Sequence, residues 1–116
     1  MNIMSLILGV FFLIFWSGIP ILADSEFEQS HKRIMALIGD SEYGEYLSSE
    51  CAACHNSNGI DTGIPSITNW PSSSFVYAIL LYKTGERTHP IMEMISSRLS
   101  DEEISSLALY YENIKN

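Results

Sequence analysis

The sequence predicts an all-α fold in a single domain, and three observations support this prediction. Apolar residues recur at three- and four-residue intervals in several segments, which is typical of amphipathic helices. The sequence has no run of β-branched residues that could supply the strands of a parallel sheet. A length of 116 residues favours one domain.

Residues 1–23 carry no charged side chain, and residues 5–22 are almost continuously apolar, broken by Gly18 and Pro20. This pattern is typical of a secretory signal peptide or of a membrane anchor. We expect cleavage after Ala23, because Gly18 and Pro20 interrupt the apolar helix just before it. A retained anchor is the alternative. In either case the rest of the chain is expected to be periplasmic or otherwise extracytoplasmic.

All charged residues follow residue 23, so the exported part carries the whole net charge of −8. This charge is expected to exclude nucleic acid and anionic membrane surfaces as partners, because both repel an acidic protein. It also disfavours docking through a ring of lysines. Membrane contact is expected only if the leader is retained.

Residues 24–40 form an N-terminal extension for which the sequence predicts an amphipathic helix. Gly39 and Asp40 are expected to end it. The extension would pack on the rest of the chain or on a partner. Its apolar face would carry Phe27, His31, Ile34, Met35 and Ile38.

Residues 41–116 form the main domain, and its first helix is predicted over residues 41–55. Ser41 would cap this helix, and acidic residues occupy its first turns. Gly44 in a helix interior costs about 1 kcal/mol relative to alanine. We therefore expect another helix to cross closely at this glycine.

That helix ends in two thiols separated by two residues and followed directly by histidine: Cys51, Cys54 and His55. This spacing is typical of covalent haem attachment, because the two sulfurs can form thioethers while the histidine ligates the iron. A disulfide, half of a zinc site and a thioredoxin-like pair are the alternatives. Zinc would need two more ligands, which His31 and His89 do not offer at the usual spacing. The sequence therefore predicts one covalent haem c with His55 as the proximal iron ligand.

Residues 56–74 are rich in Gly, Pro, Ser, Asn and Asp and show no helical or strand period. A loop of this length in a compact domain is unusual unless it wraps something, and a haem is a candidate. Within it, Trp70 would cover a haem edge or serve as an ordinary core residue.

A further helix is predicted over residues 71–85, with Pro71 at its start and one of the three following serines as its cap. Tyr82 and Arg87 are candidate hydrogen-bond partners of the haem propionates. A core tyrosine and a solvated arginine are the alternatives.

Three side chains after this helix could bind the iron from the opposite side: His89, Met92 and Met94. Methionine sulfur favours ferrous iron and suits an electron carrier. Pro90 is expected to keep this approach extended, so that a loop rather than a long helix presents the ligand.

Ser100 and Glu103 form a predicted capping box at the start of a last helix, which would run to about Ile114. The apolar stripe of this helix is the face expected to cross Gly44. It consists of Ile104, Leu107, Ala108, Tyr111 and Ile114.

The order of these elements from Tyr43 onward resembles a class I cytochrome c: helix, C-x-x-C-H, proline turn, middle helix, methionine stretch and capped last helix. More narrowly, the chain is similar to the haem subunit of flavocytochrome c sulfide dehydrogenase. The similarity lies in the lysine-x-glycine-x-arginine pattern that ends at Arg87, and in the spacing of Met92 from Asp101.

The resemblance implies roles for individual residues. The carbonyl of Pro65 would accept the Nδ1–H of His55, and Ile67 would pack on the porphyrin. Met92 would be the distal iron ligand, with Met94 as the alternative.

The resemblance also implies extracytoplasmic electron transfer rather than catalysis by this chain. A sulfide-oxidising flavoprotein (FAD) subunit would donate electrons, and a downstream cytochrome or oxidase would accept them. The alternatives are a general mono-haem carrier with other redox partners and a haem-based gas-binding or sensing module.

Overall fold

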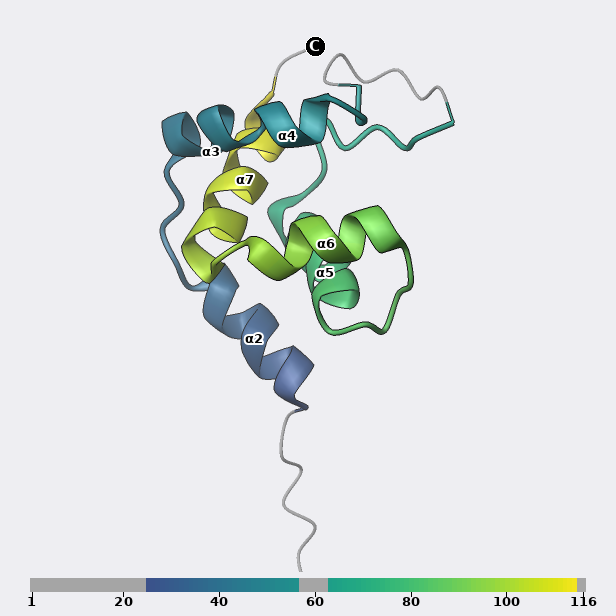
Figure 1. Cartoon of the computed structure of the whole chain (residues 1–116). Coiled ribbons are helices and arrows are strands. Elements are labelled where there is room, and N and C mark those ends of the chain that lie inside the picture. The colour runs from purple at the N-terminus through teal and green to yellow at the C-terminus, as the bar shows by residue number, and fades with distance from the viewer. Residues whose placement is uncertain (1–24, 57–62, 115–116) are drawn as a thin grey trace, which may run out of the picture.

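The computed structural model describes residues 25–56 and 63–114. This part of the chain contains helices and no strand, which confirms the predicted all-α class for it (Figure 1). The helices are α2 (Glu26–Met35), α3 (Ser41–Leu47), α4 (Ser49–Ala52), α5 (Ser72–Lys83), α6 (Pro90–Arg98) and α7 (Asp101–Asn113). The leader predicted at residues 1–23 and its cleavage lie outside the described residues. Within them, no helix has both the length and the apolar character needed to span a bilayer.

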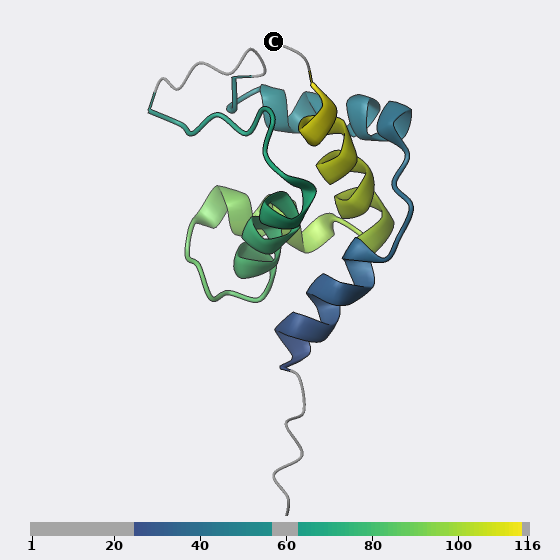
Figure 2. The same ribbon diagram turned by 180° about the vertical axis from the view of Figure 1, so that it is seen from behind.

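Helix α7 is the centre of the packing, because α2, α3 and α5 all contact it, and α5 in turn contacts α2 and α6. Both views place α3 against α7, with α2 near the start of α7, and α4 follows α3 (Figures 1 and 2). The apolar core lies between these helices. Its buried side chains are Ile34, Ile67, Phe75, Val76, Ile79, Leu80, Ile104, Leu107, Ala108 and Tyr111.

The N-terminal extension packs on this core, since Ile34 of α2 is 1% exposed. The helix is shorter than predicted, however, and ends at Met35. Ile38 lies beyond it and is fully exposed, so its predicted place on the apolar face was wrong. The chain leaves the helix because Gly39 docks closely on α7, where an added Cβ would lie 2.6 Å from the carbonyl oxygen of Ser105.

Asp40, rather than the predicted Ser41, caps α3. Its carboxylate accepts hydrogen bonds from the backbone N–H groups of Glu42 and Tyr43, at 2.9 and 3.1 Å. The single helix predicted over 41–55 is also two short helices. Ser48 stands between them and donates its hydroxyl to the carbonyl of Glu45 at 2.6 Å. A serine that bonds back to the preceding turn in this way commonly bends a helix.

The predicted close crossing at Gly44 is confirmed, because α3 packs on α7 there. A Cβ on Gly44 would lie 2.1 Å from the carbonyl oxygen of Ser106 and 2.8 Å from the Cβ of Tyr110. These residues belong to the row beside the predicted stripe. Four residues of the predicted stripe are buried in the core. The prediction of which face of α7 meets Gly44 was therefore wrong, because the neighbouring face makes that contact.

Helix α5 begins without the predicted serine cap. Glu112 of α7 instead accepts hydrogen bonds from the backbone N–H of Ser72 at 3.1 Å and from its hydroxyl at 2.7 Å. A side chain from another helix therefore satisfies the start of α5.

The approach after residue 88 is a helix, and the prediction of an extended loop was wrong. Pro90 occupies the first turn of α6, where the missing N–H costs nothing. His89 stays extended before the proline, and its Nδ1 accepts a hydrogen bond from the N–H of Met92 at 3.4 Å. The N–H of His89 donates to Glu93 at 3.2 Å in return.

The capping box that begins α7 is confirmed. The hydroxyl of Ser100 accepts the N–H of Glu103 at 3.2 Å, and the Glu103 carboxylate accepts the N–H of Ser100 at 2.8 Å. The helix ends at Asn113, with Ile114 as its C-cap.

Candidate haem site

A cavity of about 370 Å³ opens beside α7, between the C-x-x-C-H stretch on one side and α6 on the other. Most of its wall is apolar. The sequence-predicted residues that line it are Cys51, Cys54, His55, Pro65, Ile67, Trp70, Tyr82, Arg87 and Met92. Residues of the predicted first helix, of the loop after it, of the middle helix and of the stretch that follows that helix thus meet around one cavity.

On one wall of the cavity, hydrogen bonds hold His55 in one orientation and one tautomer. Its backbone N–H donates to the carbonyl of Cys51 at 2.8 Å, which continues the turn beyond α4. Its Nδ1 lies 2.6 Å from the carbonyl oxygen of Pro65. A carbonyl can only accept, so Nδ1 carries the proton and Nε2 keeps its lone pair. This is the tautomer that can bind a metal through Nε2, and the hydrogen bond at Nδ1 fixes the orientation of the ring.

The two thiols are not joined in a disulfide, and Cys51 is half-buried while Cys54 is exposed. Burial raises the pKa of the Cys51 thiol. A redox-active cysteine needs the opposite shift, because the thiolate is its working form. Among the described residues, no group of three or more His, Cys, Asp or Glu side chains could hold a metal ion. The zinc and thioredoxin-like alternatives therefore find no support here.

Tyr111 is a neighbour of Cys51. From the sequence it was predicted only as one residue of the apolar stripe of the last helix. Its hydroxyl is buried and has no hydrogen-bond partner of good geometry among the described residues. Burial, and next the neighbouring Cys51, raise the pKa of Tyr111 well above its usual value. Its ring stacks on Phe75 with a centroid separation of 5.5 Å. Only the packed structure reveals this hydroxyl beside the cysteine.

Helix α6 presents the opposite wall of the cavity. Met92 lines it together with Ile91 and Ile95, whereas Met94 does not line it and is 56% exposed. His89 also lines the cavity, but its Nδ1 accepts a hydrogen bond from the Met92 N–H. The sequence missed Ile91 and Ile95. Pro90 and Arg98 are typical of the first and last turns of a helix, so they could have predicted α6. A helix over these residues would have placed Ile91 and Ile95 beside Met92.

Arg87 and Tyr82 lie at the end of the cavity near the loop between α5 and α6. The guanidinium carbon of Arg87 stands 5.5 Å from the centroid of the Tyr82 ring. The Tyr82 ring in turn contacts His89 edge-on, with centroids 6.5 Å apart. A single cation at the rim of an apolar cavity is suited to an anionic substituent of a flat apolar ligand.

These residues fit a haem. The cavity supplies apolar walls, two thiols on one edge, a histidine in the metal-binding tautomer on one side and a thioether on the other. Mixed histidine and methionine donors of this kind are typical of electron-carrying haem proteins.

Similarity to known proteins bears on the same site. No family model matches the chain. It is 35% identical over 72 residues to the cytochrome subunit of sulfide dehydrogenase from Chlorobaculum tepidum, which covers 61% of this chain and 66% of that subunit. It is 30% identical over 80 residues to cytochrome c-554(548) from Halomonas halodenitrificans, covering 65% of this chain and 96% of that protein.

A third relative is cytochrome c-553 from Helicobacter pylori, 35% identical over 75 residues, with 60% of this chain and 75% of that protein covered. Three cytochromes thus match a helical chain whose cavity brings a C-x-x-C-H stretch opposite a methionine. The chain belongs to the class I cytochrome c family, whose members are haem electron carriers.

Proposed function

We propose that this chain is an exported one-electron carrier with a single covalent haem c. Cys51 and Cys54 form the thioethers, and His55 and Met92 ligate the iron. The haem, when bound, supplies a centre that takes up and releases one electron. The observation that carries the proposal is the hydrogen bond from His55 Nδ1 to the Pro65 carbonyl, because it leaves Nε2 free for iron.

The roles of the surrounding residues follow from the same cavity. Ile67 and Trp70 cover the porphyrin, and Tyr82 and Arg87 bind its propionates. These roles are supported by the position of each residue in the cavity lining and, for Arg87, by its positive charge.

The first experiment is expression with the bacterial haem-attachment machinery, followed by a denaturing gel stained for haem. We expect a stained band from the unsubstituted chain and none from the Cys51→Ser, Cys54→Ser double variant. An unstained band from the unsubstituted chain would overturn the covalent haem.

The distal ligand is tested by a matched pair, Met92→Ala and Met94→Ala. The unsubstituted ferric protein should show the weak near-infrared band of a methionine sulfur–iron bond. Met92→Ala should lose this band and bind carbon monoxide when reduced, whereas Met94→Ala should behave as the parent. An unsubstituted protein that itself binds carbon monoxide would favour the gas-binding alternative.

For the partner, we propose an FAD-containing, sulfide-oxidising subunit as donor and a downstream cytochrome or oxidase as acceptor. The support is the similarity to the cytochrome subunit of sulfide dehydrogenase. Purification of the tagged protein from its own cells should recover a flavoprotein that reduces the haem when sulfide is added. Recovery without any flavoprotein would favour a general carrier with several partners.

Export is tested by fractionation and by the mass of the mature chain. We expect an extracytoplasmic protein that begins at Asp24. A full-length chain in the membrane fraction would identify residues 1–23 as a retained anchor instead.

A further inference from the structure

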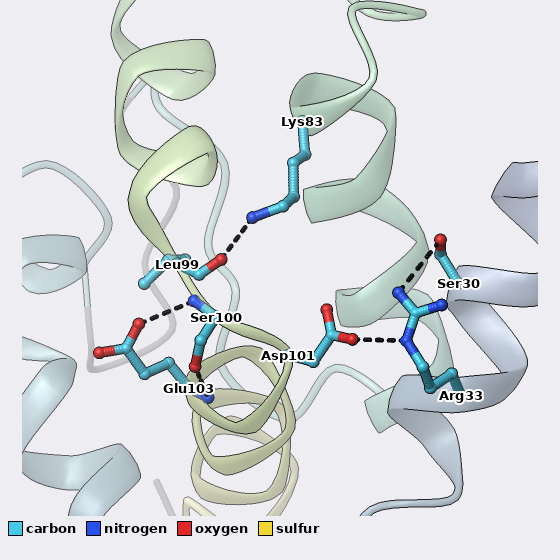
Figure 3. A network of polar contacts seen from close by, with 7 residues as sticks. All are labelled: Ser30, Arg33, Lys83, Leu99, Ser100, Asp101 and Glu103. Atoms are coloured by element: carbon cyan, nitrogen blue, oxygen red, sulfur yellow. Dashed lines mark hydrogen bonds and ion pairs between the residues drawn. The ribbon is translucent and has the colours of Figure 1, made fainter.

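Lys83 makes a polar link between two helices that face the cavity. It is the last residue of α5, and its ammonium group donates to the carbonyls of Ser96, at 3.3 Å, and of Leu99. Ser96 lies in the last turn of α6, and Leu99 is its C-cap. Figure 3 shows the Lys83 side chain reaching across to Leu99.

These carbonyls are the groups that a helix end leaves without a full set of partners. The carbonyl of Ser96 accepts the backbone N–H of Leu99 at 3.3 Å, which leaves its second lone pair for another donor at the negative end of the helix dipole. A lysine from a neighbouring helix therefore satisfies both a hydrogen-bond and an electrostatic requirement of α6. The contact is stronger than a neutral hydrogen bond because the donor is charged.

The turn that Lys83 holds is also held from the other side. Asp101, directly after the Ser100 cap, accepts a hydrogen bond from Arg33 of α2 at 2.6 Å (Figure 3). Arg33 thus ties α2 to α7, and Lys83 ties α5 to α6. The two contacts flank one turn but restrain different helices, which makes each a control for the other.

Lys83 itself does not line the cavity, whereas α6 contributes Ile91, Met92 and Ile95 to it, and Leu99 completes that wall. Apart from its apolar side chains, α6 is restrained at its start by His89 and at its end by Lys83 and by an exposed ion pair between Arg98 and Glu50 of α4, at 3.4 Å. An exposed ion pair contributes little, so loss of the Lys83 contact would loosen the end of α6, and Met92 with it.

We propose that Lys83 is a positioning residue that holds α6 against the cavity and so sets how firmly Met92 occupies the sixth position of the haem iron. This inference rests on the proposed function, since it takes Met92 as the distal ligand.

The test uses the haem-loaded ferric protein and measures displacement of the sixth ligand by imidazole. Lys83→Met keeps the apolar stem but removes the donor, and we expect it to raise the apparent affinity for imidazole about tenfold. Lys83→Arg keeps a charged donor and should restore most of the parent behaviour. Lys83→Gln keeps a neutral donor and should be intermediate.

Arg33→Met is the control. It removes the contact on the other side of the same turn and should lower the thermal midpoint without changing the imidazole affinity. A merely structural role for Lys83 would make the two variants alike, with similar losses of stability and similar imidazole affinities.

The outcomes separate this inference from the proposed function. If the unsubstituted protein shows the methionine–iron band and Lys83→Met binds imidazole as the parent does, the positioning role is wrong and the ligand assignment stands. If the unsubstituted protein lacks that band, both the Met92 assignment and the positioning role are overturned.

Discussion

At the scale of the residue, Gly44 shows how one missing side chain allows two helices to meet. The backbone of α7 passes so closely that a Cβ on Gly44 would overlap the carbonyl of Ser106 at 2.1 Å. The opposing atom is backbone, so it cannot turn aside as the end of a flexible side chain could. The helix-propensity cost of glycine, about 1 kcal/mol, is therefore offset by the contact that glycine permits.

We expect Gly44→Ala to destabilise the haem-loaded protein by about 1–3 kcal/mol, because overpacking outweighs the propensity gain. Denaturant unfolding gives the measurement. Glu45→Ala, at the next and exposed position of α3, is the control and should change the free energy of unfolding by less than about 0.5 kcal/mol. An unchanged or more stable Gly44→Ala protein would mean that α3 and α7 do not cross this closely.

Tyr111 makes a second point at the residue scale. Its buried hydroxyl has no hydrogen-bond partner of good geometry among the described residues, so it brings a desolvation cost with little in return. We expect Tyr111→Phe to keep the stacking on Phe75 and to leave the free energy of unfolding within about 1 kcal/mol of the parent. A loss of about 2 kcal/mol or more in the haem-loaded protein would show that the hydroxyl has a partner there, with the Cys51 sulfur and the Ser48 hydroxyl as the candidates.

At the scale of the element, α5 depends on another helix for its first turn. Glu112 of α7 accepts both the hydroxyl and the N–H of Ser72, and these hydrogen bonds hold the pKa of the Glu112 carboxyl below its ordinary value. A carboxyl with a lowered pKa in the folded state stabilises that state above its unfolded pKa. The contribution is lost as the pH falls through the lower, folded value.

We therefore expect Glu112→Gln to be less stable than the parent at pH 7 and to approach the parent below about pH 4. Thermal midpoints measured between pH 3 and pH 7 test this directly. Glu102→Gln, on an exposed part of the first turn of α7, is the control. A difference between Glu112→Gln and the parent that stays constant across this range would contradict the linkage.

At the scale of the whole molecule, the dominant property is acidity. A net charge of −8 on a small chain creates a negative field that favours cationic partners and reagents. Lysine and arginine together number six, against fourteen acidic residues, so this charge balance disfavours docking through a ring of lysines.

Small redox reagents of opposite charge make this field measurable. We expect reduction by a cationic ruthenium ammine complex to slow as ionic strength rises, because salt screens the attraction. Reduction by an anionic reagent such as dithionite should accelerate over the same range. If both rates respond to salt in the same direction, the field at the haem does not follow the net charge.

Much of the site could be predicted from the sequence, because the residues that form it are close together along the chain. The two thiols and His55 lie within one helical turn, and the Ser100–Glu103 box lies within another. Interactions that join residues three or four apart depend on the backbone of a single turn, so spacing alone predicts them. The all-α class followed from periodicity in the same way.

The errors lie where a contact from elsewhere in the chain decides the outcome. Helix α2 ends before Ile38 because Gly39 docks on Ser105, and α5 starts on Glu112 rather than on its own serines. The stretch after His89 becomes a helix whose phase directs Met92 into the cavity and Met94 out of it.

Taken by itself, the sequence determined the class of fold, the C-x-x-C-H motif and the acidity of the chain, since these depend on residue types and short spacings. The tertiary structure alone decided which row of α7 receives Gly44, where the Tyr111 hydroxyl lies and which helix end Lys83 satisfies. Each of these depends on how helices distant in sequence dock together, and no short spacing encodes that geometry.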